Sequence, residues 1–272
     1  MIQDGINMGT GRVQSIAFGD GTLYTSSSSN HKEGQFKPTV GHTYDDWFLI
    51  PSVAPVVAMQ GTDAKFITLP GRDGDYDLST WIRKDRPAYR NRSGSFEFYV
   101  ENDHEFRMTI FPKIYNSLHG KKFKMVLVDD DPGYYFEGRF AVSESRADQN
   151  WSAVKIDYNL QPWKRRVREI KDKTIWDTFN FEADYDYDPW NLSAVSVSGS
   201  KTLELWGDGY PWKPEITVAG GGSMTVKFGG KTATITGSEV TDGELGRASY
   251  GNNKMILTGS GTVGINWRGG SL

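Results

Sequence analysis

The sequence contains no cysteine among its 272 residues. The chain therefore forms no disulfide bond and has neither a thiolate nucleophile nor cysteine ligands for zinc. A chain of this length can bury about three quarters of its unfolded surface in a core, so its stability does not depend on such links. The absence of cysteine is compatible with assembly in a reducing cytoplasm.

Long apolar runs are absent as well. No stretch approaches the roughly 18–20 apolar residues of a transmembrane helix, and residues 1–15 lack the basic region and apolar core of a secretory signal. The net charge of −3 creates no field that attracts nucleic acid or an anionic membrane. We therefore expect neither membrane insertion nor sequence-specific binding of nucleic acid.

Aromatic residues and glycine are abundant instead. The chain has nine Trp, thirteen Tyr, fourteen Phe and 31 Gly. Aromatic side chains suit pleated, half-buried surfaces, and glycine supplies the positive φ of tight turns. This composition predicts a mostly β protein with many short strands.

Residues 1–43 are polar and rich in glycine and serine, which predicts an N-terminal extension or arm with little core of its own. Two alternatives stand: a flexible segment, or one that becomes ordered on a neighbouring subunit. Order is expected to begin near residues 44–50. The alternating segments 65–69 and 95–100 predict half-buried strands, and residues 107–111 predict a third.

One helix is expected over residues 112–119. The proline in its first turn is favoured because the missing N–H would be unpaired there in any case. Ile114, Tyr115 and Leu118 share one face of this helix. Gly120 stands where a left-handed residue usually ends a helix.

A β-hairpin is expected next along the chain. Residues 123–128 and 134–142 are strand-like, and residues 129–133, with three Asp, a Pro and a Gly, form a turn by composition. Residues 151–160 alternate again and are expected to pair nearby.

The second half of the chain predicts a separate domain. The charged run 164–173 marks the boundary, so that the expected divisions are 1–43, a domain over 44–164, a linker over 165–190 and a domain over 191–272. Gly229 and Gly230 predict a two-residue hairpin loop. Closely spaced antiparallel strands indicate a β-sandwich or jelly roll. These strands are expected at residues 194–197, 202–206, 215–218, 224–228, 232–236, 254–257 and 262–266.

Acidic clusters are the first candidates for a metal site. Residues 103–105, Asp-His-Glu, are adjacent on the chain, and neighbours on a strand point to opposite faces, so a solvated turn is favoured. Residues 129–131 offer three carboxylates, and an acidic turn is favoured over a Mg²⁺ or Ca²⁺ site. Residues 184–188 alternate like the start of a calcium loop, but Pro189 and Val195 replace the required Gly and Glu.

No motif for nucleophilic, nucleotide or metal-dependent catalysis occurs in the sequence. We therefore expect a protein that is not an enzyme and carries no cofactor or metal. The basic run 164–173 could contact phosphates, but it has no interleaved aromatic residues, and a solvated linker is favoured. A glycan hydrolase is a weaker alternative, because no carboxylate pair can be singled out.

The C-terminal aromatic residues allow two interpretations. Buried, they fill a core; exposed on a sandwich, they stack on sugar rings. The loop-like segment 210–214 is where exposed ones are expected, so Tyr210 and Trp212 are candidates for a sugar or partner contact. The aromatic residues considered are Trp190, Trp206, Tyr210, Trp212, Tyr250 and Trp267.

Five segments, in order, resemble the distal tail (Dit) proteins of long-tailed bacteriophages. They are residues 44–49, 69–78, 118–122, 128–139 and 160–164. The second is similar to the family's IPGRDGxYDLS segment and the fourth to its DDPxYYYxGR hairpin; Trp163 stands where the family usually has Tyr. The residues of these family motifs are Pro70, Gly71, Arg72, Asp73, Gly74, His119, Gly120, Asp131, Pro132, Gly138 and Arg139. Residues 210–216 and 252–259 match more loosely, and residues 1–43 lie outside the pattern.

The resemblance implies a fold and a role. The N-terminal domain would be a β-sandwich or barrel-like domain with one helix, forming a homo-hexameric ring. That ring would join the tail-tube protein to the tail-tip protein at the virion tail tip, after assembly in the host cytoplasm. The C-terminal domain would be a galectin-like sandwich that carries receptor-binding proteins or touches host glycans. The alternative function is a carbohydrate-binding module, and residues 1–43 are a hypothetical clamp on the neighbouring subunit.

Overall fold

The computed structural model describes residues 13–33, 35–71, 73–81, 87–101, 106–147, 151–167, 192, 194–207, 209–211, 213–219, 223–236, 245–266 and 270–272. The chain divides into two units, Met1–Val167 and Arg168–Leu272, each with its own hydrophobic core. Both consist of antiparallel strands, so the expected mostly β fold is confirmed. Within these ranges no helix has both the length and the apolar character needed to cross a membrane.

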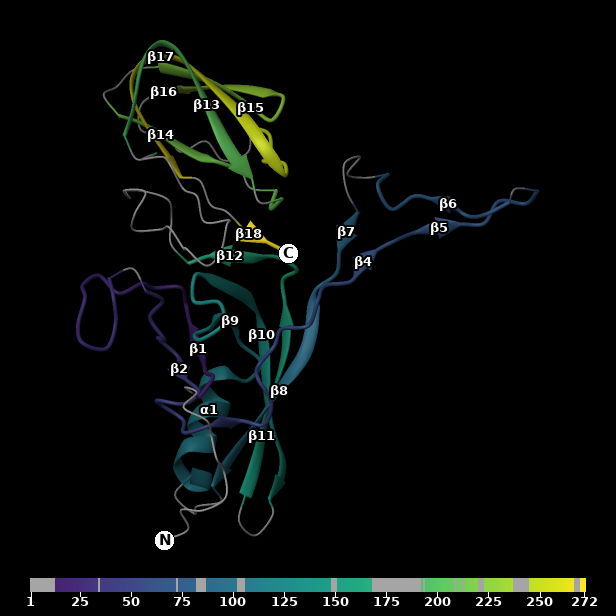
Figure 1. Cartoon of the computed structure of the whole chain (residues 1–272), viewed down its shortest axis with the longest axis vertical. Helices are drawn as coiled ribbons and strands as arrows, with labels where there is room; N and C mark the ends of the chain where they lie inside the picture. Colours follow the sequence, from purple (N-terminus) through teal and green to yellow (C-terminus); the bar gives the residue numbers. More distant parts are fainter. Residues whose placement is uncertain are drawn as a thin grey trace. The chain divides into compact units, whose positions relative to one another are not determined.

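The first unit is built on one large antiparallel sheet (Figure 1). Its strands are ordered β2-β1-β9-β10-β11-β8-β3, and β12 pairs with the start of β10. The long neighbours β10 and β11 form a hairpin. The bounds are β1 (Ile16–Gly19), β2 (Gly41–His42), β3 (Ile50–Pro51), β8 (Arg92–Glu101), β9 (Lys122–Leu127), β10 (Tyr134–Ala147), β11 (Trp151–Leu160) and β12 (Lys164–Arg166).

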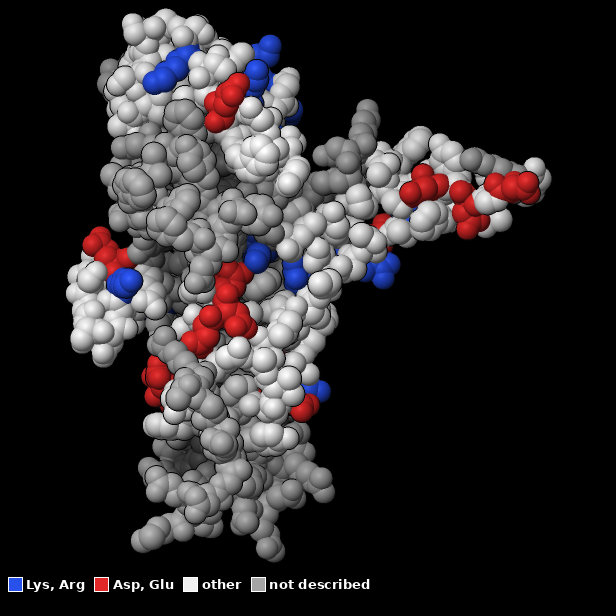
Figure 2. Space-filling view, viewed as in Figure 1, with Lys and Arg blue, Asp and Glu red and all other residues white. Residues whose placement is uncertain are grey.

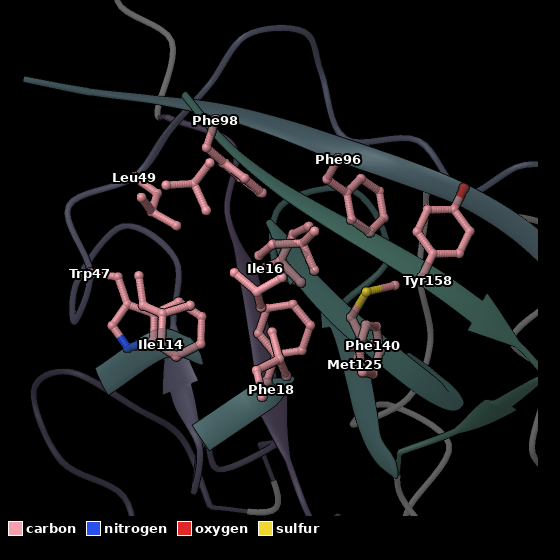
Figure 3. Close-up of a cluster of buried hydrophobic side chains, with 14 of the residues drawn as sticks. Ile16, Phe18, Trp47, Leu49, Phe96, Phe98, Ile114, Met125, Phe140 and Tyr158 are labelled. Carbon is pink, nitrogen blue, oxygen red and sulfur yellow. The ribbon is translucent and has the colours of Figure 1, made fainter. Parts of the chain in front are cut away.

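Helix α1 (Phe111–Leu118) packs against this sheet and buries Ile114 and Leu118. Alternate residues of the strands point into the same core (Figure 3). Phe18 lies at its centre, with its ring 5.8 Å from that of Trp47 and 5.1 Å, edge to face, from that of Phe140. Aromatic pairs in this geometry add about 0.5–1.5 kcal/mol each beyond the area they bury.

Several local predictions are confirmed. Strands occur at β8, β9, β10 and β11, close to their expected bounds. The helix is present, and Gly120 has the positive φ of 71° expected after its end. The helix face was predicted with one error, because Tyr115 is 41% exposed while Ile114 and Leu118 are buried.

The strand expected at residues 107–111 is wrong. Phe106–Ile110 form a π-helical turn that runs directly into α1. A five-residue apolar alternation is too short to separate strand from helix, and here the helix-starting proline at Pro112 decided the local conformation.

The expectation that residues 1–43 lack a core is wrong for the described part of that segment. Strand β1 pairs with β2 on one side and with β9 on the other, and Ile16 and Phe18 are fully buried. Ile16 lies opposite Leu127 in the sheet. Because its partner β9 is more than a hundred residues away, the polar composition around β1 gave no sign of its burial. Residues 1–12 lie outside the described residues.

The predicted start of the linker, at residue 165, is also wrong, because it lies inside a strand. Lys164–Arg166 form strand β12, in which Arg165 lies opposite Tyr135 and Arg166 opposite Tyr134. The charge of this run concealed the strand, because the cationic ends of Arg and Lys can reach solvent or acidic partners from a sheet position. Residues 168–191 lie outside the described residues.

The second unit is an antiparallel sheet in the order β13-β17-β15-β16, with β14 also paired to β17. The Gly229-Gly230 hairpin is confirmed, with φ of 57° and 77° between β15 and β16. Buried residues alternate with exposed ones along the strands. The bounds are β13 (Val195–Gly207), β14 (Glu215–Ala219), β15 (Ser223–Phe228), β16 (Lys231–Thr236), β17 (Gly251–Asn266) and β18 (Gly270–Ser271).

Four of the short strands expected in this unit are halves of two long ones. β13 spans the expected strands 194–197 and 202–206, and β17 spans 254–257 and 262–266. Gly199 and Gly259 lie opposite each other near the middle of this pair, both with positive φ. The glycines bend the paired strands without ending them, whereas the sequence suggested breaks.

Candidate interaction surfaces

A two-stranded arm extends from the first unit (Figure 1). We define the arm as residues 61–90. At its base β4 (Thr62–Asp63) pairs with β7 (Ala88–Tyr89), and further out β5 (Phe66–Ile67) pairs with β6 (Tyr76–Asp77). The backbone N–H of Arg90 donates to the carbonyl of Gly61 at 2.8 Å, which closes the base.

The arm and the segment leading to it expose large apolar side chains. Met59 is 91% exposed and Trp81 74%. Phe66 and Ile67 are both exposed, so the prediction of a half-buried strand at residues 65–69 is wrong for the isolated chain. The full set is Val53, Val56, Met59, Phe66, Ile67, Leu69, Tyr76 and Trp81. A two-stranded ribbon is only marginally stable by itself, and apolar surface of this extent on a soluble protein marks an interaction site.

The family-motif residues 70–74 form the tip of the arm. Gly71 and Gly74 both have φ of 79°, and a Cβ at either position would meet no atom within 4 Å. These glycines are therefore explained by the turn. Pro70 and Asp73 are exposed at the same tip, where acidic side chains gather (Figure 2). Arg72 lies outside the described residues.

The root of the arm is held by two buried side chains, Arg92 and Tyr158. Arg92 donates from Nε to the carbonyl of Pro162 at 2.8 Å and from Nη1 to the carbonyl of Ala58 at 3.3 Å. The hydroxyl of Tyr158 accepts the backbone N–H of Ala58 at 2.9 Å. Gly94 makes room for this tyrosine, because a Cβ there would lie 2.4 Å from its hydroxyl oxygen.

Arg92 is only 6% exposed. Burial lowers its pKa, while the neighbouring Tyr158 acts in the opposite direction. Its guanidinium also lies over the ring of Phe136, 5.4 Å from the centroid, which favours the charged form. Arg92, which lies just after the arm, therefore clamps the segment that enters the arm to the segment that follows β11.

Other family-motif residues fasten α1 to β10. Arg139 donates from Nη1 to the carbonyl of Gly120 at 2.9 Å, and the N–H of Gly120 donates to Phe140 at 2.7 Å. Nδ1 of His119 accepts the N–H of Val142 at 3.1 Å. The two motifs, whose contacting residues Gly120 and Arg139 are 19 positions apart, thus meet at the end of the helix and have a structural role there.

The three carboxylates at residues 129–131 contact three different side chains and do not converge on a common point. Asp129 accepts the N–H and hydroxyl of Ser15 at 2.9 and 3.0 Å, and Asp130 accepts the side chain of Gln14 at 3.2 Å. Asp131, followed by Pro132 in the turn, pairs with Lys164 at 2.7 Å. In the part of the chain that the structure describes, no three His, Cys, Asp or Glu are grouped to hold a metal.

The described end of the basic run is engaged with acids. Lys164 pairs with Asp131, and Arg165 lies 3.5 Å from Glu137. The cations of Lys164 and Arg165 are therefore balanced by carboxylates of the same unit. The acidic clusters at 103–105 and 184–188 lie outside the described residues.

Trp206 and Tyr250 are the exposed aromatic residues of the second unit as far as it is described. They are 62% and 77% exposed, and their rings meet edge to face with centroids 6.1 Å apart. Tyr210, which the sequence analysis selected, is half-buried, and Trp212 lies outside the described residues. The exposure of Trp206 could have been predicted from the sequence. Leu203 and Leu205 are expected to point inward, so that residues 204 and 206 of the same strand point outward.

Comparison with known proteins bears on the fold. No protein-family model matches the chain, and no curated protein matches its sequence. Among solved structures it is similar to the Dit protein of phage SPP1, with a TM-score of 0.57 over 96% of this chain and 100% of that one. The fold is Dit-like. Sequence identity is 12%, so the likeness establishes the fold alone. SPP1 Dit is described as a paradigm of the hub adsorption apparatus in phages that infect Gram-positive bacteria.

Proposed function

We propose that this protein is a structural subunit of the tail tip of a phage with a long, non-contractile tail. In this proposal six copies form a ring that joins the tail-tube protein to the tail-tip protein. The Dit-like fold over nearly the whole chain supports the role. The observation that carries the ring is the arm, which presents Phe66, Ile67 and Trp81 to solvent in the isolated chain.

The arm suits a head-to-tail contact. An arm that leaves one subunit and lies on the body of the next makes a contact between different surfaces, and such contacts close into rings when the rotation allows. Covering the exposed apolar side chains supplies the free energy of association. The clamp of Arg92 and Tyr158 fixes the direction in which the arm leaves, which lowers the entropy lost on assembly.

The acidic residues near the tip of the arm predict the charge of the surface that the arm contacts on the neighbouring subunit. Asp73, Asp75 and Asp77 are exposed there, and Asp75 accepts the hydroxyl of Thr68 at 2.7 Å. The hydroxyl and N–H of Ser79 hold the pKa of Asp77 below its usual value, so this carboxylate stays charged. We expect the neighbouring subunit to meet the tip with basic side chains.

A ring subunit of this kind acts by binding. The proposal therefore includes no catalytic step, cofactor or metal. It places the protein at the virion tail tip, after assembly in the host cytoplasm, with receptor-binding proteins as further partners. The galectin-like character of the second unit remains part of the proposal.

The arm can be tested with two matched tryptophan variants of the full-length chain. Trp81 and Trp206 are both strongly exposed, but only Trp81 lies on the arm. Sedimentation velocity of Trp81→Asp should show the hexamer replaced by smaller species, whereas Trp206→Asp should keep it. An unchanged hexamer in Trp81→Asp, together with unchanged assembly of Phe66→Asp, would remove the arm from the interface.

A further inference from the structure

Four side chains on the outward face of β13 and β17 form a rectangle. Trp206 lies opposite Asn252, and Glu204 lies opposite Lys254 in the antiparallel register. All four are exposed. The residues that alternate with them point to the core and are buried: Leu205 and Asn253 between the corners, and Leu203 and Met255 beside them. The alternation of two paired strands therefore places one aromatic and three polar groups side by side.

Tyr250 extends this rectangle at its aromatic end. Its ring stands at 67° to that of Trp206. The turn that carries it is held by the buried Asn253, whose Oδ1 accepts the N–H of Ser249 at 2.8 Å and whose Nδ2 donates to the carbonyls of Ser249 and Gly251 at 2.9 and 2.8 Å. The position of the exposed ring is thus fixed by hydrogen bonds beneath it.

The polar end of the rectangle is also organised. Nδ2 of Asn252 donates to Glu204 at 3.2 Å, and Nζ of Lys254 lies 3.4 Å from the other carboxylate oxygen. The hydrogen bond from Asn252, followed by Lys254, holds the pKa of Glu204 below its usual value. Donors and an acceptor are therefore displayed together, and the charges of Glu204 and Lys254 cancel.

We propose that Trp206, Tyr250, Glu204, Asn252 and Lys254 form a binding site for a neutral glycan. A pyranose ring has an apolar C–H face, which packs on an aromatic ring, and an edge of hydroxyls, which both donate and accept. Two residues along a strand span roughly 7 Å. A sugar stacked on Trp206 consequently brings its hydroxyls over Glu204 and Lys254, while Tyr250 closes the side.

The balanced charges of Glu204 and Lys254 favour a neutral ligand over a polyanion. A polyanion such as a polyglycerol phosphate needs several uncompensated cations, whereas the one cation of the rectangle, Lys254, is paired with Glu204. The same outward face carries small hydroxyl side chains on β16, Thr232, Thr234 and Thr236, all exposed. The exposed Lys227 of β15 lies on the same face, opposite Ile256 of β17 and Thr232 of β16. A neutral saccharide chain on this face therefore meets hydroxyl side chains and one further amine donor.

The site can be tested on the full-length protein by saturation-transfer NMR and calorimetry. The probes are neutral oligosaccharides built from glucose, galactose or N-acetylglucosamine, with a glycerol phosphate oligomer as the anionic comparison. We expect at least one neutral probe to bind and Trp206→Ala to weaken it by about tenfold or more. Tyr250→Ala and Glu204→Gln should weaken it by smaller factors, and Trp206→Phe should retain part of the affinity.

The matched control is Ser196→Ala, an exposed substitution ten residues before Trp206 on the same strand β13, which should leave affinity unchanged. Thermal unfolding of each variant separates lost binding from lost folding. The proposal is overturned if no neutral probe binds, if only the anionic oligomer binds, or if folded Trp206→Ala binds as the wild type does. Because Trp206 lies outside the arm, these results are independent of ring assembly, which is measured on the same samples.

Discussion

The hydroxyl of Tyr158 accepts a hydrogen bond from the backbone N–H of Ala58, a hundred residues earlier in the chain, at 2.9 Å. Ala58 lies just before the arm, and Tyr158 belongs to the central strand β11. The contact ties the departure of the arm to an inner strand of the sheet, which lies between β10 and β8. Together with Arg92 it makes the direction of the arm a property of the core.

Removing this hydroxyl should affect both stability and assembly. In Tyr158→Phe the N–H of Ala58 loses its partner, and because Ala58 is exposed this should cost about 0.5–1.5 kcal/mol in the free energy of unfolding. The loosened arm should also shift ring dissociation to higher protein concentration. Urea unfolding and sedimentation measure the two effects. Tyr99→Phe, which removes the hydroxyl of an exposed tyrosine, should change neither.

Replacing Phe18 tests whether the N-terminal segment belongs to the core. Phe18 is fully buried between Trp47 and Phe140. Phe18→Ala should therefore destabilise the first unit by about 3–5 kcal/mol in chemical unfolding. A change near zero would mean that β1 is not part of the core of the first unit.

The same burial bears on the choice of N-terminal deletions. Deleting residues 1–43 removes β1 and β2 as well as residues 1–12, whereas deleting residues 1–12 alone leaves both strands.

Gly138 should tolerate no side chain. A Cβ at this position would lie 2.2 Å from the carbonyl oxygen of Asn159, a backbone atom of the adjacent strand. Gly138→Ala should lower the free energy of unfolding by about 1–3 kcal/mol. Gly133→Ala is the matched control, because nothing lies within 4 Å of its added Cβ. Equal melting temperatures for the two variants would contradict the close approach.

The proposed glycan site should depend on acid in a defined direction. The pKa of Glu204 is lowered by Asn252 and Lys254, so the carboxylate stays ionised well below neutral pH. Above the ordinary pKa of Glu the ionised carboxylate makes its full contribution to glycan affinity. This contribution is lost as the pH falls through the lowered pKa of Glu204. Affinity should be constant from neutral pH down to about pH 5 and fall only below the ordinary Glu value of about 4.3. Calorimetry across this range, with Glu204→Gln as the flat comparison, checks it.

Sequence reasoning succeeded where structure is local. The β9–β10 hairpin and α1 were predictable because neighbouring segments pair or cap themselves through adjacent turn residues. The same approach missed β1, whose burial depends on β9 more than a hundred residues away. The sequence analysis also predicted that strands end near Gly199 and Gly259, although both glycines lie within continuous strands.

The candidate surfaces were harder to predict than the fold. The alternation of residues 65–69 correctly indicated a strand, but Phe66 is exposed in the isolated chain and is covered only in the proposed ring. Nothing in the local sequence marks Arg92 as a buried clamp, because its partners Ala58 and Pro162 come from distant segments. Trp206, in contrast, could have been assigned to the outer face from the inward Leu203 and Leu205.

The solution mass of the wild-type chain tests the central claim most directly. Light scattering on a sizing column, over a series of protein concentrations, distinguishes a ring from a single subunit of 30.5 kDa. The account predicts a mass about six times that of the subunit, approached as concentration rises. A mass that stays at that of one subunit at every concentration would contradict it.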